Sequence, residues 1–140
     1  MIARWRLPDK DELNAMYNVL HKNGVGGFAN DFYWSSSVYN ANNAWNLYFD
    51  IGFQYNYDKN LTFRVRAVRD FKSHKNYNIA DRTHYGYVFH KDGNHYKECK
   101  ITDEQQPISW YNAIEKYPFP SLLEILALKT REIRDNMRAL

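Results

Sequence analysis

The side chains that could do covalent or metal chemistry in this chain of 140 residues are few and far apart. The single cysteine, Cys99, can supply neither an intramolecular disulfide nor a cysteine-based zinc site. Ser35, Ser36 and Ser37 lack the glycine-flanked motif of a nucleophilic serine, so we expect them to bond local backbone. No histidine has His-Glu-x-x-His spacing, and we therefore predict no catalytic residue, no metal and no cofactor. The histidines are His21, His74, His84, His90 and His95.

The charge balance does not favour nucleic acid as a partner. The net charge is only +3 and comes from interspersed residues of both signs. Arg64, Arg66 and Arg69 could bind an anion, but we expect a solvated face with carboxylate partners. No stretch approaches membrane-spanning length, and the first residues lack the apolar core of a signal peptide. We therefore expect no nucleic acid, no membrane insertion and no secretion by a standard signal.

The chemistry of binding is concentrated between residues 42 and 63. Aromatic residues make up 17% of the chain, and in this segment they mix with Asn and Asp. Exposed aromatic groups rimmed by polar ones mark binding surfaces, and Tyr with Asn is typical of antibody-like paratopes. The alternative is a set of core aromatics in a small sheet with an Asn-rich turn. The candidate ligand-binding residues are Asn46, Leu47, Tyr48, Asp50, Ile51, Phe53, Tyr55, Asn56, Tyr57, Asn60, Leu61 and Phe63.

Several separated motifs follow one another in the first half of the chain. They are Trp5–Asn14, Gly26–Phe28, Tyr33–Ser37, Ala44–Trp45 and Arg64–Arg69. Together they resemble the C-type-lectin-like variable proteins of diversity-generating retroelements. The resemblance implies a C-type-lectin-like scaffold with a variable face that binds a macromolecular ligand, such as a protein on a target cell surface. The localisation stays open, and a virion or a larger surface assembly would both be compatible with the resemblance.

In that family a reverse transcriptase misreads template adenines, so asparagine codons of the AAY type change at their first two bases. All twelve candidate residues are of types that such codons can reach. Asp58 fits either the variable or the fixed class. Because Asp50, Asn56 and Asp58 fall within the diversified stretch, we do not expect a fixed Ca²⁺ site there. The residues that resemble the fixed framework are Trp45, Phe49, Gly52, Gln54, Lys59, Thr62 and Arg64.

Two other functions remain open. The chain could be a structural or tail-tip module with a fixed ligand. It could also resemble the formylglycine-generating enzymes, which share the lectin-like fold, but one cysteine does not supply their cysteine- and metal-dependent oxidation. We therefore predict a binding protein and not an enzyme.

The elements that must position these residues begin with a helix after Leu7-Pro8. Asp9 is a good N-cap, Glu12 can complete a capping box, and Gly24 suits the left-handed position beyond the helix end. We expect Trp5 and the tryptophans of the two central motifs to be core anchors. The apolar face of the helix comprises Leu13, Met16, Tyr17 and Leu20, and the other two tryptophan anchors are Trp34 and Trp45.

Strands are predicted in the middle of the chain. Residues 63–69 alternate strictly, which predicts a half-buried strand with Arg64 and Arg66 outward and Phe63, Val65 and Ala67 inward. Residues 85–89 and 95–99 flank a turn at 91–94, whose Asp-Gly pair is a strong hairpin signal.

These elements predict an α+β protein with a C-type-lectin-like fold, in which helices flank a small twisted antiparallel sheet. Residues 1–70 form the lectin-like core, with the variable region at about 42–63. Residues 71–118 are a β-hairpin segment that completes the same domain, or begins a second unit. Residues 119–140 form a helix, capped by Ser121, that packs on the domain or joins copies of the chain as a homo-oligomer.

Overall fold

The computed structural model describes residues 4–119 and 133–138. Residues 4–119 contain two α-helices, a short 3₁₀ helix and eight strands, and residues 133–138 are also helical. In chain order they are α1 (Lys10–Val19), η1 (His21–Asn23), β1 (Phe32–Val38), β2 (Asn43–Tyr48), β3 (Phe53–Asp58), β4 (Thr62–Phe63), β5 (Val68–Lys72), β6 (Gly86–Asp92), β7 (His95–Lys100), β8 (Ile108–Ser109) and α2 (Trp110–Lys116).

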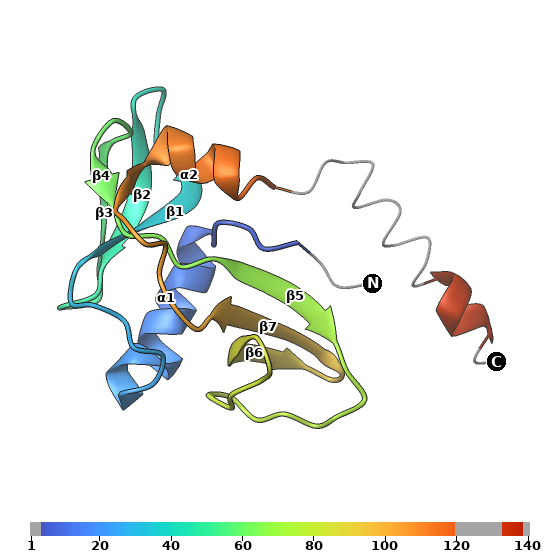
Figure 1. Cartoon of the computed structure of the whole chain (residues 1–140). Coiled ribbons are helices and arrows are strands. Elements are labelled where there is room, and N and C mark those ends of the chain that lie inside the picture. The colour runs from blue at the N-terminus through green and yellow to red at the C-terminus, as the bar shows by residue number, and fades with distance from the viewer. Residues whose placement is uncertain (1–3, 120–132, 139–140) are drawn as a thin grey trace.

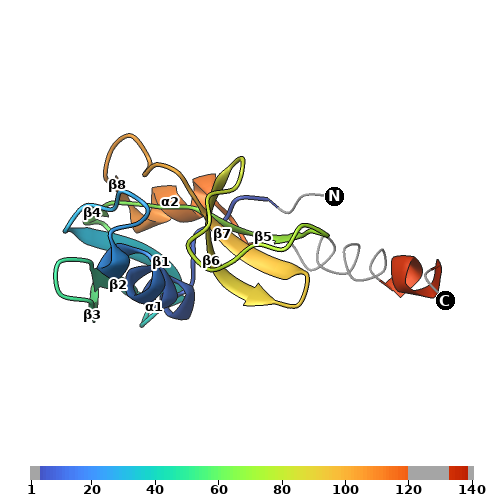
Figure 2. The same cartoon turned by 90° about the horizontal axis from the view of Figure 1, so that it is seen from below.

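Two small antiparallel sheets carry the fold, and α1 contacts both of them (Figure 1). One sheet has the order β1-β2-β3 and the other has the order β5-β7-β6, while β4 and β8 form a separate short pair. Figure 2 shows the two sheets at opposite sides of the body. The predicted α+β class is confirmed, and the arrangement is compatible with a small twisted-sheet lectin-like fold. None of the helices in the described part of the chain has the length and apolar composition that a membrane crossing requires.

The first helix forms as its sequence predicts. Asp9 accepts a hydrogen bond from the Glu12 N–H, and the Glu12 carboxylate accepts one from the Asp9 N–H, which completes the capping box. The chain leaves the helix through η1, and Gly24 lies beyond it with a φ of 73°, in the left-handed region. Three of the four residues on the predicted apolar face are fully buried, and Tyr17 is half-buried; the three are Leu13, Met16 and Leu20.

The sheet β1-β2-β3 has a different helix against each face. Cross-strand partners share a face, so the register Trp34↔Asn46 and Asn46↔Tyr55 places these three side chains together. Leu47 points to the opposite face, where it joins the core under α1. Trp34 packs with Ala113 of α2 in a second core on the first face. The helix α2 therefore covers part of the face that carries the odd-numbered aromatic residues of β3.

The second half of the chain supplies strands that complete structures begun by the first half. Strand β5 pairs with β7, β4 pairs with β8, and Arg6 forms an isolated bridge with Val68. The predicted hairpin is confirmed as β6-β7, and Gly93 in its turn has a φ of 61°. Phe89 of β6 and Cys99 of β7 reach the same core as α1, so this hairpin packs against the first half.

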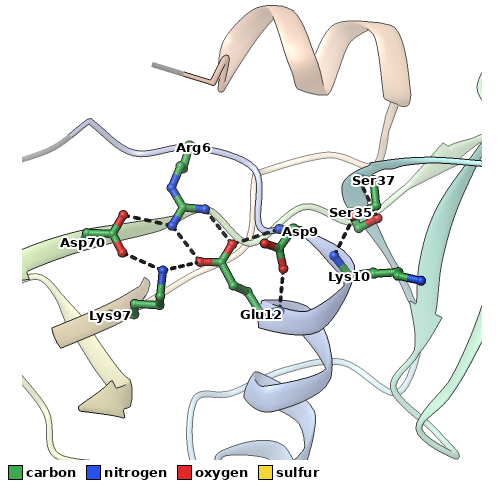
Figure 3. Close-up of polar contacts among 8 residues, drawn as sticks. All are labelled: Arg6, Asp9, Lys10, Glu12, Ser35, Ser37, Asp70 and Lys97. Carbon is green, nitrogen blue, oxygen red and sulfur yellow. Dashed lines mark hydrogen bonds and ion pairs between the residues drawn. The ribbon is translucent and has the colours of Figure 1, made fainter. Parts of the chain in front are cut away.

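A network of four charges, of which Arg6 and Glu12 are buried, joins the N-terminal segment, α1 and the second sheet (Figure 3). Arg6 donates from both terminal nitrogens to the two carboxylate oxygens of Glu12, each at 2.6 Å. Arg6 also donates to Asp70 of β5 at 3.0 Å. Lys97 of β7 donates to Glu12 at 2.9 Å and to Asp70 at 2.8 Å. The same Glu12 that caps α1 thus fixes the helix against the second sheet.

The strand predicted over residues 63–69 is wrong in its middle. Residues 64–67 belong to no strand, and the chain passes there between β4 and β5. Arg66, predicted to face solvent, is only 1% exposed. It donates to Asp103 at 2.7 Å and to three backbone carbonyls, and its guanidinium lies 4.1 Å from the Phe28 ring centroid. These partners lie far away in the sequence, so alternation alone could not reveal them.

Arg69 and Arg64 also differ from a solvated face. Arg69 is 7% exposed and pairs with the buried Glu98, donating from Nε at 2.8 Å. Its guanidinium lies 4.6 Å from the ring centroid of Trp5. Arg64 is half-exposed and donates to Asp31 at 3.0 Å. The carboxylate partners were expected, whereas the burial was not.

Other expectations are met in part. Trp34 is fully buried, with its indole N–H donated to the Ile108 carbonyl at 2.9 Å, but Trp5 and Trp45 are only half-buried. The helix α2 was not predicted, since its seven residues carry no complete apolar stripe. Of the C-terminal helix predicted over 119–140, residues 120–132 and 139–140, including Ser121, lie outside the described residues. Residues 133–138 are helical and exposed.

Replacing Glu12 with Gln should cost about 3–5 kcal/mol of folding stability, because a buried Arg6 loses its main counter-charge. Burial raises the pKa of Glu12, but the opposing effect of Arg6, the Asp9 N–H and Lys97 is larger. The pKa therefore falls from 4.5 to about 2. A pKa depressed in the folded state gives stability that is complete above 4.5 and is lost as the pH falls toward 2. Urea denaturation at neutral and acid pH measures both effects.

The matched control is Asp11→Asn, which removes an exposed carboxylate from the same helical turn. We expect it to change stability by less than about 1 kcal/mol. An equal loss in both variants, or an unchanged acid sensitivity in Glu12→Gln, would contradict the role given to the pair.

Candidate ligand-binding surface

Six aromatic side chains gather on one face of the sheet β1-β2-β3 and the adjoining β4, and we call them the aromatic surface. The odd-numbered residues of β3 share a face with Tyr48, because Tyr48 pairs with Phe53 and the strand alternates. Phe32 of β1 joins them through its pairing with Tyr48. The six residues are Phe32, Tyr48, Phe53, Tyr55, Tyr57 and Phe63.

Phe32 lies at the centre of this aromatic surface. Its ring stacks on Tyr48 with centroids 4.3 Å apart and on Phe63 at 5.1 Å. It meets Tyr57 edge-on at 5.5 Å and Tyr55 at 6.0 Å. Such contacts add to burial about 0.5–1.5 kcal/mol each and hold the rings in fixed positions. The surface is therefore a stiff platform.

Sequence reasoning missed Phe32, although a signal existed. Phe32 and Trp34 stand two residues apart in one strand, so they share a face. Trp34 is buried, and its ring packs against the Phe63 ring with centroids 4.5 Å apart. On this shared face Trp34 joins the core that contains Ala113, and Phe32 joins the aromatic surface, while Tyr33 points the other way into the core under α1.

The edge of the surface is open to solvent. Phe53 is 62% exposed and Tyr57 is 36% exposed. The remaining members are half-buried; they are Phe32, Tyr48, Tyr55 and Phe63. A phenylalanine that is mostly exposed next to half-exposed tyrosines is an arrangement typical of contact surfaces.

Four further candidate residues lie in the two turns that bound β3. Asp50 and Ile51 are exposed in the turn between β2 and β3, and Asn60 and Leu61 are exposed in the turn before β4. Asp58 accepts hydrogen bonds from the backbone and side chain of Asn60, which fixes the second turn. These turns extend the aromatic surface at both ends with polar and aliphatic groups.

Three candidate residues are not displayed with the others. Leu47 is fully buried on the opposite face, in the core under α1. Asn56 also lies on the opposite face and accepts a hydrogen bond from the Asn43 side chain at 3.0 Å. Asn46 faces the aromatic side but is only 1% exposed. Composition alone could not separate these faces, because strand boundaries decide which residue alternates with which.

Asn46 is held in an unusual environment. Neither its side-chain oxygen nor its nitrogen has a hydrogen-bond partner among the described residues. It lies between Trp34 on β1 and Tyr55 on β3, beneath the aromatic surface. An unsatisfied buried amide costs about 1–3 kcal/mol.

Residues that alternate with the candidates have packing roles. Phe49 is fully buried and lies 4.5 Å from Tyr33 between ring centroids. Gly52 has a φ of 79°, and a Cβ there would come 2.3 Å from the Tyr17 ring. Lys59 is 6% exposed and donates to the Ala41 carbonyl at 2.9 Å. These contacts give physical reasons for a fixed framework at these three positions.

The serines and the cysteine that were considered for catalysis are engaged in the packing and hydrogen bonding of the fold. Ser35 accepts the Ser37 N–H at 3.1 Å, a local backbone bond of the expected kind, and donates to the more distant Trp45 carbonyl at 2.7 Å. Ser37 accepts the Lys10 N–H at 3.0 Å, whereas the buried Ser36 hydroxyl has no hydrogen-bond partner among the described residues, contrary to expectation. Burial raises the pKa of Cys99 to about 11, which keeps the thiol protonated at neutral pH. Within residues 4–119 and 133–138, no three His, Cys, Asp or Glu side chains gather as a metal site would require.

Comparison with known families places this surface in context. Residues 2–69 match the family model of the Lcl C-terminal domain. This is a C-type-lectin-like domain family, so the match agrees with a lectin-like ligand-binding module. The matched span contains every residue of the aromatic surface. No curated protein and no solved structure gives a significant match.

Replacing Asn46 with Leu should raise the free energy of unfolding by about 1–3 kcal/mol, because an apolar group of similar size removes an unpartnered amide. Urea denaturation measures the change. Asn43→Leu is the matched control, since the Asn43 amide has a partner in Asn56 and should lose stability. A loss of stability in both variants would mean that the Asn46 amide is hydrogen-bonded in solution.

Proposed function

We propose that this chain is a ligand-binding protein and not an enzyme, and that its aromatic surface contacts a macromolecular ligand. A protein on a target cell surface is the ligand class that we favour. The observation that carries the proposal is the set of stacked, partly exposed rings on β1, β2, β3 and β4, held by a rigid sheet. Rigid aromatic groups bury much area with little loss of side-chain entropy, which suits recognition.

We further propose that this surface is diversified by adenine-directed mutagenesis of a retroelement. The matched family is associated with variable proteins of such elements. Exposed residues reachable from asparagine codons alternate with Phe49, Gly52 and Lys59, whose packing tolerates little change. The unpartnered Asn46 is also consistent with diversification. An asparagine encoded by an unchanged template codon has not been selected for its packing.

The size of the surface limits how it can bind. A standard protein interface uses about 20–30 residues on each side, and the aromatic surface with its two turns is smaller. Affinity would therefore depend on a few aromatic anchors, with the polar turns forming a rim. Phe53 and Tyr57 are the best anchors because each leaves part of its ring free to contact a partner.

Replacing Phe53 and Tyr57 together with Ala should weaken ligand binding at least about 100-fold and leave the fold intact, because anchors of this type often contribute 2 kcal/mol or more. Surface plasmon resonance measures binding to the target protein, and urea denaturation measures folding. Ile79→Ala with Tyr85→Ala is the matched control, since these residues are 41% and 48% exposed beside the other sheet. An unfolded anchor variant would mean that these rings are core, which defeats the proposal.

Deep sequencing of this gene in a population of its source tests the diversification. We expect substitutions at adenines of the candidate codons, while Trp45, Gly52 and Arg64 stay constant. At Leu47 the surviving residues should remain apolar, because that side chain is fully buried. Scattered and mostly synonymous changes across the gene would instead indicate a fixed surface with one ligand.

A further inference from the structure

The outer edge of β3 is free along its length. Within the described part of the chain β3 is hydrogen-bonded as a strand to β2 alone. The Lys59 N–H donates to the Asn42 carbonyl at 2.8 Å, in continuation of the β2-β3 register. Bonded pairs alternate in an antiparallel ladder, so the backbone N–H and C=O groups of Gln54 and Asn56 point away from β2. These groups can pair with a further strand.

This edge lacks the features with which proteins usually prevent strand addition. The sequence of β3, from Phe53 to Asp58, contains neither proline nor a basic residue. It shows no break in register with β2, so no bulge twists the edge away. An exposed regular edge without such protection is a template for another extended chain.

A groove runs beside this edge, between β3 and α1. Its volume is about 510 Å³, large enough for one or two side chains of a bound segment. Asp11 lies on the wall formed by α1, and Tyr55 lies on the wall formed by β3. The remaining lining residues are Asn14, Gly52, Phe53 and Gln54.

The one charged side chain among the residues that line this groove is Asp11, a carboxylate in a chain whose net charge is +3. Asp11, Asp50 in the preceding turn and Asp58 at the end of β3 are all exposed. Lys10 directly precedes Asp11 in the sequence, and its ammonium group lies 4.8 Å from the centroid of the Trp45 ring. The tyrosines of β3 add ring faces that attract cations. The local chemistry therefore complements lysine or arginine.

We propose that the ligand is engaged through an extended, basic peptide segment that adds as a strand to the free edge of β3. Alternate side chains of the segment lie against the aromatic surface, and a lysine or arginine enters the groove toward Asp11. Main-chain hydrogen bonds to Gln54 and Asn56 supply affinity that does not depend on side chains. This inference rests on the proposed function and names the chemistry of its ligand.

The experiment is an NMR titration of the full chain with a short, capped peptide of alternating lysine and valine. We expect the amide signals of Gln54 and Asn56 to shift and their hydrogen exchange to slow, while the β6-β7 hairpin is unaffected. A peptide with glutamate in place of lysine should not bind. The absence of shifts in β3 at millimolar peptide, or equal binding of the glutamate peptide, would overturn the inference.

Matched variants separate backbone pairing from side-chain contact. Gln54→Pro removes an outward N–H, which an edge strand tolerates, and should abolish binding of the lysine peptide, whereas Gln54→Ala should retain it. Asp11→Asn should weaken binding about threefold. If Gln54→Pro does not fold, peptides methylated on alternate backbone nitrogens make the same test, and equal binding in both methylation frames would count against strand addition.

These outcomes also distinguish the two proposals. If the target protein binds Gln54→Pro normally but not the Phe53→Ala, Tyr57→Ala variant, the aromatic surface functions by another mode and only strand addition fails. If neither variant affects binding of the target protein, the proposed function fails as well.

Discussion

The bidentate ion pair between Arg6 and Glu12 is the contact on which the arrangement of this protein depends. Both oxygens of the buried carboxylate are held by Arg6, and Glu12 also caps α1 and receives Lys97 from the second sheet. Removing two charges from water is costly, and it is tolerated here because every partner is in place. These bonds therefore fix α1 against the N-terminal segment and the second sheet. That position gives the sheet β1-β2-β3 a firm support on one face.

The firm support explains how the opposite face can be both stiff and tolerant of change. Leu47 and Phe49 anchor the sheet in the core under α1, while Phe53 and Tyr57 extend from the far edge into solvent. Truncating a side chain at that edge leaves no cavity in either core, so the expected cost is small. A surface of this kind can change its chemistry without changing the fold, which is what a diversified binding protein requires.

Buried arginines connect the halves of the chain in the same way. Arg66 reaches Asp103 and the backbone around Gly26, and Arg69 pairs with Glu98. Each bond spans more than 25 residues of sequence, and each guanidinium also stacks on an aromatic ring. These links make the β6-β7 hairpin part of the support for the first sheet. The charges of these two arginines are thus balanced by carboxylates inside the protein.

The sequence by itself determined the local features. Asp9, Glu12 and Gly24 predicted the limits of the first helix, and Asp92-Gly93 predicted the hairpin, because caps and tight turns depend on neighbouring residues only. It also located the aromatic and asparagine-rich segment. Only the tertiary structure decided which of those residues are displayed. Asn46 and Leu47 are covered by packing from distant segments, while Phe32 enters the aromatic surface from another strand. Burial and pairing are set by contacts far apart in the chain, and residue types do not specify them.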